Sequence, residues 1–184
     1  MRLTGRQAAG LFVIGALGGL AGDACHVYSG TTEYLKDDLP FIWKSQFWFP
    51  IAVGLATVSV GELRLRLAPA RPGDLWEAVA AIAAVIAIYA TTAAVTDEAT
   101  GTATVLTWAL AFLVLARFGD GRPALICATL AAILGPAAEV VLIETDVSAY
   151  SPAADGLFGV AEWLPALYFA FGVVAARLAE LLPR

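Results

Sequence analysis

The sequence predicts an all-α integral membrane protein that folds as one bundle of six transmembrane helices. Hydrophobic residues make up 60% of its 184 residues, whereas soluble domains are usually about 45–50% apolar. Its apolar runs approach the length, about 20 residues, at which a helix crosses a bilayer. The short alternating strands of a membrane β-barrel are not found among them. Little sequence is left outside these runs, so we expect a single domain over residues 1–184.

Glycines and aromatic residues mark the first two expected spans. Residues 8–28 form a span in which Gly15 and Gly19 are spaced so that a second helix can approach closely. The glycine-rich first span, which also contains the pair Gly18 and Gly22, could in addition support a homo-oligomer. Residues 46–61 form the second span, which opens with Phe-Trp-Phe-Pro at residues 47–50. Aromatic residues favour the membrane interface, and a proline in the first helical turn costs no intrahelical hydrogen bond.

Four more spans are expected over residues 75–95, 102–116, 124–143 and 157–178. Pro136 lies inside the fifth span and Pro165 inside the sixth. Because proline disturbs the hydrogen bonding of a helix, we expect a bend at each. Two bent helices would separate on one side and open an apolar crevice for a lipid or another hydrophobic ligand. Helix packing alone is the alternative explanation of both bends.

Basic residues are distributed unequally between the two sides of the predicted bundle. The side of the termini carries nine arginines, which are Arg2, Arg6, Arg64, Arg66, Arg71, Arg117, Arg122, Arg177 and Arg184. The loops of the other side are acidic and carry only Lys36 and Lys44. Since basic loops stay in the cytoplasm, we expect both termini to be cytoplasmic.

Four ionisable residues lie towards the non-cytoplasmic ends of the spans: Asp23, His26, Glu139 and Glu162. Their depth would allow all four to share one layer of the bundle. A carboxylate inside the membrane needs a proton, a partner or a wet cavity. The four residues therefore predict either the polar floor of a cavity or a proton or cation site. Alternatively, Asp23, His26 and Glu162 lie among the lipid headgroups, where charge costs less.

Catalytic, metal-binding and nucleic-acid-binding functions find little support in the sequence. The motifs of hydrolases, metalloproteases and phosphate-binding loops are missing, so we expect neither enzyme activity nor a cofactor. Asp23 and His26 could share a helical face, but one histidine without a cysteine cluster is a weak metal site. Cys25 and Cys127 lie in apolar runs, where we expect buried small side chains and no disulfide. The net charge of −5 is spread over the loops, which argues against binding to nucleic acid.

Two stretches of the sequence resemble one family of membrane proteins. They are FWFPIAVGLATVSVG, residues 47–61, and YSPAADGLFGVAEWLPALYFAFG, residues 150–172. In order and spacing they resemble the second span, the last loop and the sixth span of the Insig (insulin-induced gene) proteins. Animal members bind oxysterols, retain the sterol sensor Scap and promote degradation of HMG-CoA reductase. The resemblance therefore implies six spans and a non-enzymatic, lipid-sensing binding protein.

The composition limits what this resemblance implies about partners. An alanine-rich chain with many arginines, few lysines and minimal loops is typical of a GC-rich bacterium, so we expect it in the plasma (inner) membrane. Most such organisms lack Scap and make no sterols, and a Scap-type partner is not implied. Asp120, in the loop after the fourth span, could correspond to a conserved aspartate of the family, although its neighbours differ.

These observations predict an Insig-like lipid sensor that binds a lipid or sterol-like molecule, such as diacylglycerol, in an intramembrane crevice. We expect Glu139 to meet the polar group of the ligand and aromatic residues to form the walls. The predicted lipid-binding residues are Phe47, Trp48, Pro136, Glu139, Glu162, Trp163, Pro165, Tyr168 and Phe169. The alternative is a small proton-coupled transporter that uses Asp23, His26 and Glu139. A lipid-modifying enzyme would need a nucleophile that the sequence does not offer.

Overall fold

Six α-helices make up most of the computed structural model, which describes residues 2–95, 100–156 and 158–182. They are α1 Gly5–Ser29, α2 Trp48–Leu67, α3 Leu75–Ala94, α4 Thr100–Phe118, α5 Arg122–Glu144 and α6 Leu164–Leu181. Within the described residues, all six are long and apolar enough to cross a membrane. The predictions of a mostly helical fold and of six helices long and apolar enough to cross a membrane are therefore confirmed.

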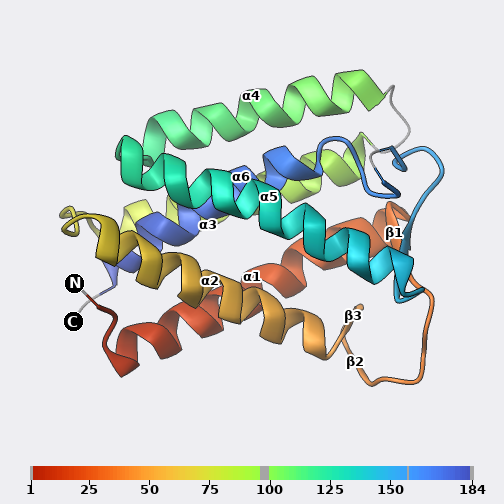
Figure 1. The fold of residues 1–184 in the computed structure, drawn as a ribbon, viewed down its shortest axis with the longest axis horizontal. Helices are drawn as coiled ribbons and strands as arrows, with labels where there is room; N and C mark the ends of the chain where they lie inside the picture. The colour runs from red at the N-terminus through yellow and green to blue at the C-terminus, as the bar shows by residue number, and fades with distance from the viewer. Residues whose placement is uncertain (1, 96–99, 157, 183–184) are drawn as a thin grey trace.

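The helices form an elongated bundle whose two ends differ (Figure 1). The N- and C-termini lie together at one end, which we call the terminal end. The short strands lie at the opposite end, which we call the strand end. α6 is the central helix and packs against each of the other five. In the 18-residue apolar stretch of α6, 72% of the residues are buried, compared with 33% or less in the corresponding stretch of every other helix. α6 therefore forms the core of the bundle.

Glycines let the helices approach closely at the two main contacts. A Cβ atom at Gly19 of α1 would lie 2.9 Å from the Cβ atom of Val53 in α2. A Cβ atom at Gly172 of α6 would lie 2.7 Å from the Cα atom of Ala128 in α5. Both distances are too short for a side chain, so each glycine sets the spacing of a helix pair. Gly18, by contrast, has open space beside it.

Two strand pairs close the strand end, where we expected only loops and, at Gln46, the start of the second span. β1 (Thr32–Tyr34) pairs antiparallel with β4 (Ser148–Tyr150). β2 (Phe41–Ile42) pairs antiparallel with β3 (Ser45–Gln46). The first pair ties the α1–α2 connection to the α5–α6 connection, although the two are distant in the sequence.

The prolines act differently from the sequence-based expectation. α6 begins at Leu164, so Pro165 lies in its first turn. The expected bend at Pro165 is wrong, because a proline in the first turn replaces no intrahelical hydrogen bond. Pro136 does lie inside a helix, and α5 continues across it to Glu144. Residue 157, at which we expected the sixth span to begin, lies outside the described residues.

The end of α2 also differs from its expected span. The helix continues to Leu67, so Arg64 and Arg66 belong to its last turn and not to a loop. Arg64 is 1% exposed, because its guanidinium group lies inside the bundle and pairs with acidic side chains there. Arg184, which we counted among the basic residues of this side, lies outside the described residues.

Candidate functional site

An apolar crevice of about 340 Å³ lies between α2 and α5. One wall runs along α2 from Trp48 to Leu63, and the other runs along α5 from Cys127 to Leu142. Aromatic side chains of α3 and α6 contribute further lining: Tyr89, Tyr168 and Phe171. Most of the lining residues are apolar, so the crevice suits a hydrocarbon chain.

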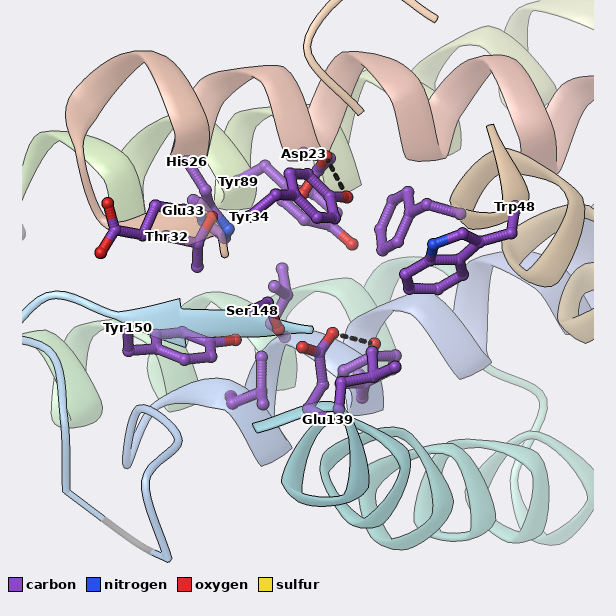
Figure 2. Close-up of a pocket in the computed structure, with 15 residues that line it drawn as sticks. Asp23, His26, Thr32, Glu33, Tyr34, Trp48, Tyr89, Glu139, Ser148 and Tyr150 are labelled. Atoms are coloured by element: carbon purple, nitrogen blue, oxygen red, sulfur yellow. Dashed lines mark hydrogen bonds between the residues drawn. The ribbon is translucent and has the colours of Figure 1, made fainter. Parts of the chain in front are cut away.

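A smaller polar chamber of about 30 Å³ adjoins the crevice at the strand end (Figure 2). Its polar lining comes from five elements and the central helix: Asp23, His26, Thr32, Glu33, Tyr34, Tyr89, Glu139, Ser148, Tyr150 and Tyr168. Figure 2 shows Asp23 and Tyr34 on one side of the chamber and Glu139 and Tyr150 on the other. The chamber and the crevice share Trp48, Phe49, Tyr89, Glu139, Leu142 and Tyr168. Together they form one amphipathic site, polar at the strand end and apolar along the helices.

Two carboxylates face this chamber, and each accepts hydrogen bonds from hydroxyl groups. Oδ2 of Asp23 accepts from the Tyr34 hydroxyl at 2.8 Å and from Oγ of Ser45 at 2.5 Å. Oε1 of Glu139 accepts from the Tyr168 hydroxyl at 2.9 Å. Asp23 thereby holds the segment that contains β1 and β3 against α1, and Glu139 links α5 to α6.

The two chamber tyrosines that lie on the strands, Tyr34 and Tyr150, keep their hydroxyl protons. Burial, with a smaller effect of the Asp23 carboxylate, raises the pKa of Tyr34 above its usual value. Burial, followed by the charge of Glu139, raises the pKa of Tyr150 well above its usual value. Both phenols therefore stay protonated at any physiological pH.

His26 is a packed core residue at the edge of the chamber. Its Nε2 atom lies 2.8 Å from Oγ1 of Thr92, and its ring lies 5.2 Å from that of Tyr89 and 5.1 Å from that of Trp163. In the part of the chain that the structure describes, no group of three or more histidine, cysteine or acidic side chains is arranged for a metal ion.

Two hydroxyl groups of the chamber wall have no hydrogen-bond partner among the described residues. They are Oγ1 of Thr32 in β1 and Oγ of Ser148 in β4, and both oxygen atoms are buried. Buried polar atoms are normally paired with protein or water. Thr32 and Ser148 therefore leave two unsatisfied hydroxyl groups in the wall of the chamber.

Three of the nine residues predicted to bind lipid lie together at this site. Trp48, Glu139 and Tyr168 line both the crevice and the chamber. Asp23 and His26, which we placed in the same layer of the bundle as Glu139, also line the chamber. Glu162, the fourth residue that we placed in that layer, does not line the chamber, so depth along the helices grouped three of the four.

The other six predicted residues lie elsewhere among the described residues. Phe47 and Glu162 are exposed at the strand end, outside both cavities. Trp163 packs on His26 and Tyr150, and Phe169 packs on Trp108 and Phe112 of α4. The remaining two, Pro136 and Pro165, do not line either cavity.

Several chamber residues were not predicted as site residues. Tyr89 stands in a run of alanine, isoleucine and valine, where a lone tyrosine was a usable signal. Thr32, Tyr34 and Ser148 reach the chamber only because β1 pairs with β4, and these short strands have no clear local pattern. Long-range pairing of this kind is set by the whole fold.

A charge cluster at the terminal end is separate from this site. It consists of Arg64, Arg71, Glu77, Asp120, Arg177 and Glu180. Glu180 of α6 accepts hydrogen bonds from Arg64, from Arg71 at 3.0 Å and from Arg177 at 2.8 Å. Asp120 pairs with Arg64 and is largely buried, so its role here is to hold the α4–α5 loop against α2.

The chain is similar to proteins of one family. It is 48% identical over 182 residues to a Mycolicibacterium vanbaalenii protein named INSIG protein homolog, a match that covers 98% of this chain and 89% of the relative. The crystal structure of a mycobacterial Insig homologue, MvINS from Mycobacterium vanbaalenii, matches with a TM-score of 0.95 and 48% identity, covering 98% and 96% of the two chains. A crystal structure of a cross-linked MvINS trimer matches with a TM-score of 0.94, covering 98% and 95%. No family model matches the chain.

Proposed function

The chain belongs to the Insig family, and from this premise we propose that it is a non-enzymatic membrane protein that binds a lipid or sterol-like molecule and acts as a lipid sensor. The single observation that carries the proposal is the junction of an apolar crevice with a polar chamber at Glu139 and Tyr168. Such a site suits an amphipathic ligand, because its apolar part and its polar part meet matching surfaces. Diacylglycerol, with acyl chains and a small hydroxyl head, is the example that we expect.

The lipid would enter the crevice between α2 and α5 with its polar end towards the strands. Trp48, Tyr168 and Phe171 would contact the hydrocarbon chains. Glu139 would accept a hydrogen bond from a hydroxyl of the head, since Tyr168 occupies only its Oε1 atom. A large anionic head would be disfavoured, because Asp23 and Glu139 would repel it.

We place the terminal end in the cytoplasm of a bacterium and the strand end outside the plasma membrane. Arg64, Arg71 and Arg177 lie in the charge cluster of the terminal end, and basic residues favour the cytoplasmic side. Lys36 and Lys44 are the only basic residues of the α1–α2 connection at the strand end. In this orientation the chamber lies near the outer leaflet.

We also propose that the chain forms a homo-oligomer in the membrane. The support is the cross-linked MvINS trimer, a relative of the same fold. Gly18 of α1 supports it further, because a Cβ atom there would meet no atom within 4 Å, which leaves space for a helix of a second copy to approach.

The proposal is tested by mass spectrometry of the lipids that survive purification of the chain in a mild detergent. We expect one dominant lipid with a small head, at about one per binding site. Glu139→Leu should lower its retention by about tenfold, roughly the effect of losing one good hydrogen bond to a charged group. A lipid mixture that mirrors the bulk membrane, unchanged by Glu139→Leu, would contradict the proposal.

A second candidate function is a small proton-coupled transporter. The observation that favours it is that Asp23, His26 and Glu139 line one chamber. Chains of acidic and histidine residues carry protons in many transporters. Substrate-dependent proton flux into liposomes that contain the purified chain would support this candidate, and the lipid-binding protein should show none.

A further inference from the structure

We propose that the polar chamber binds an ammonium group, held between Asp23 and Glu139 and surrounded by tyrosine rings. The group belongs either to the head of an aminolipid or to a small free amine. If the ammonium group belongs to an aminolipid, the inference rests on the proposed function, because the acyl chains of that lipid would occupy the crevice. If it belongs to a small free amine, the inference is independent of the proposed function.

The first support is the charge of the chamber. The carboxylates of Asp23 and Glu139 face it, and the described residues that line it include no lysine or arginine. The two lysines of the strand end are engaged elsewhere: Nζ of Lys36 donates to the carbonyl oxygen of Thr145 at 2.7 Å, and Nζ of Lys44 lies 4.8 Å from the ring centre of Tyr28. Carboxylates near hydrocarbon need a compensating charge or a proton. Within the described residues the protein does not supply that charge, so a ligand can.

The second support is the pattern of hydrogen-bond acceptors. A primary ammonium has three donors and no acceptor. The chamber offers carboxylate oxygens of Asp23 and Glu139, and the hydroxyl oxygens of Thr32 and Ser148 lie buried in its wall without a partner among the described residues. A neutral alcohol head, such as that of diacylglycerol, can also donate to Glu139, but it has only one donor and no charge, so we expect it to bind more weakly than an ammonium. Phosphate would be repelled by both carboxylates.

The third support is the aromatic lining. Tyr34, Tyr89, Tyr150 and Tyr168 line the chamber together with Trp48. Cations are attracted to aromatic faces, and aromatic cages that bind ammonium groups use this attraction. A site that combines such rings with carboxylates is complementary to an ammonium in both respects.

The size of the chamber limits the ligand to a compact group. A cavity holds one water molecule when about 10–15 Å³ is open to it. The chamber, at about 30 Å³, therefore accommodates a primary ammonium of about the size of water more readily than a trimethylated one.

The chamber adjoins cavities on two sides. On one side it shares Glu139 and Tyr168 with the crevice, from which a lipid head would come. On the other side it shares Thr32, Tyr34 and Tyr150 with a groove of about 690 Å³ at the strand end. A free amine would arrive through this groove.

The test compares two single-chain probes that differ only in the head, hexadecylamine and hexadecanol. Binding to the purified full chain in a non-ionic detergent at neutral pH is followed by tryptophan fluorescence. We expect the amine to bind at least about tenfold more tightly than the alcohol. Glu139→Gln and Asp23→Asn should remove this preference, whereas Glu144→Gln should keep it, because Glu144 is an exposed carboxylate on the same helix as Glu139.

The two sources are distinguished by methylammonium chloride, with sodium chloride as the control for ionic strength. Displacement of hexadecylamine by methylammonium indicates a site for free amines, and displacement only by long-chain amines indicates an aminolipid head. Equal affinity for amine and alcohol, or a preference that survives Glu139→Gln, would overturn the ammonium site. Lipid binding would stand in that case. If the chain also retains no specific lipid on purification, the proposed function fails as well.

Discussion

The hydroxyl of Tyr168 in α6 donates a hydrogen bond of 2.9 Å to Glu139 in α5, at the point where the apolar crevice meets the polar chamber. This bond links the central helix to one wall of the crevice. It also orients the Glu139 carboxylate, because one of its oxygen atoms is held by the tyrosine. The pair therefore connects the packing of the bundle with the recognition of a polar group.

Tyr168→Phe keeps the aromatic ring and removes only this donor. We expect the variant to lose about 1.5–3 kcal/mol of stability, the usual worth of a hydrogen bond to a charged group. It should also retain less lipid, because the carboxylate is no longer held in place. Thermal unfolding in detergent and lipid mass spectrometry measure the two effects.

Tyr28→Phe is the matched control, since the Tyr28 side chain is 63% exposed. It should change neither the unfolding temperature nor the retained lipid. If both tyrosine variants behave alike, the Tyr168–Glu139 bond has no special role.

The fold class and part of the site were accessible from the sequence. Long apolar runs predict six helices because little else can satisfy the backbone inside a membrane. Glu139 and Asp23 were found because a carboxylate in such a run needs a local explanation. Both statements depend on position along one helix, which the sequence gives directly.

The direction in which each side chain points could not be predicted in the same way. Tyr168 and Phe169 are neighbours on α6, and successive side chains of a helix point about 100° apart. Tyr168 faces the crevice, whereas Phe169 packs on Trp108 of α4. Because α6 is buried on nearly all sides, no polar face in its sequence distinguishes the two directions. Trp163 was assigned to the crevice for the same reason, and it packs on His26 instead.

A side chain that fills the crevice should exclude the lipid. Ala138 of α5 lines the crevice, and Ala138→Phe places a ring where an acyl chain would lie. We expect the retained lipid to fall by at least about tenfold, with little change in stability because the ring enters an open space. Lipid mass spectrometry at equal protein concentration measures the loss.

Ala137→Phe is the control for that change. Ala137 is the preceding residue, is exposed and does not line the crevice. Its ring should point into the surrounding hydrocarbon and leave lipid retention unchanged. Equal loss of lipid in the two variants would mean that the lipid is bound outside the crevice.

The terminal-end charge cluster should contribute strongly to stability. The Glu180 side chain is fully buried and accepts hydrogen bonds from Arg64, Arg71 and Arg177. Glu180→Ala leaves buried guanidinium groups without this partner, a change that usually costs about 3–5 kcal/mol. We expect a large fall in the unfolding temperature. Glu62→Gln, which changes the surface ion pair with Arg66, should have little effect on the unfolding temperature. A similar fall in the unfolding temperature of both variants would show that the buried cluster contributes no more than a surface pair.

The close contact of α1 with α2 should tolerate no side chain at Gly19. Gly19→Ala would bring a Cβ atom within 2.9 Å of Val53, near its backbone, where neither helix can yield without a shift. Overpacking of this kind usually costs about 1–3 kcal/mol. Gly18→Ala is the control, because no atom lies within 4 Å of the new methyl group. It should leave stability unchanged or raise it slightly, since alanine favours the helix. Thermal unfolding of the two variants decides the matter, because equal stability would show that the glycine spacing of α1 does not set the distance between the helices.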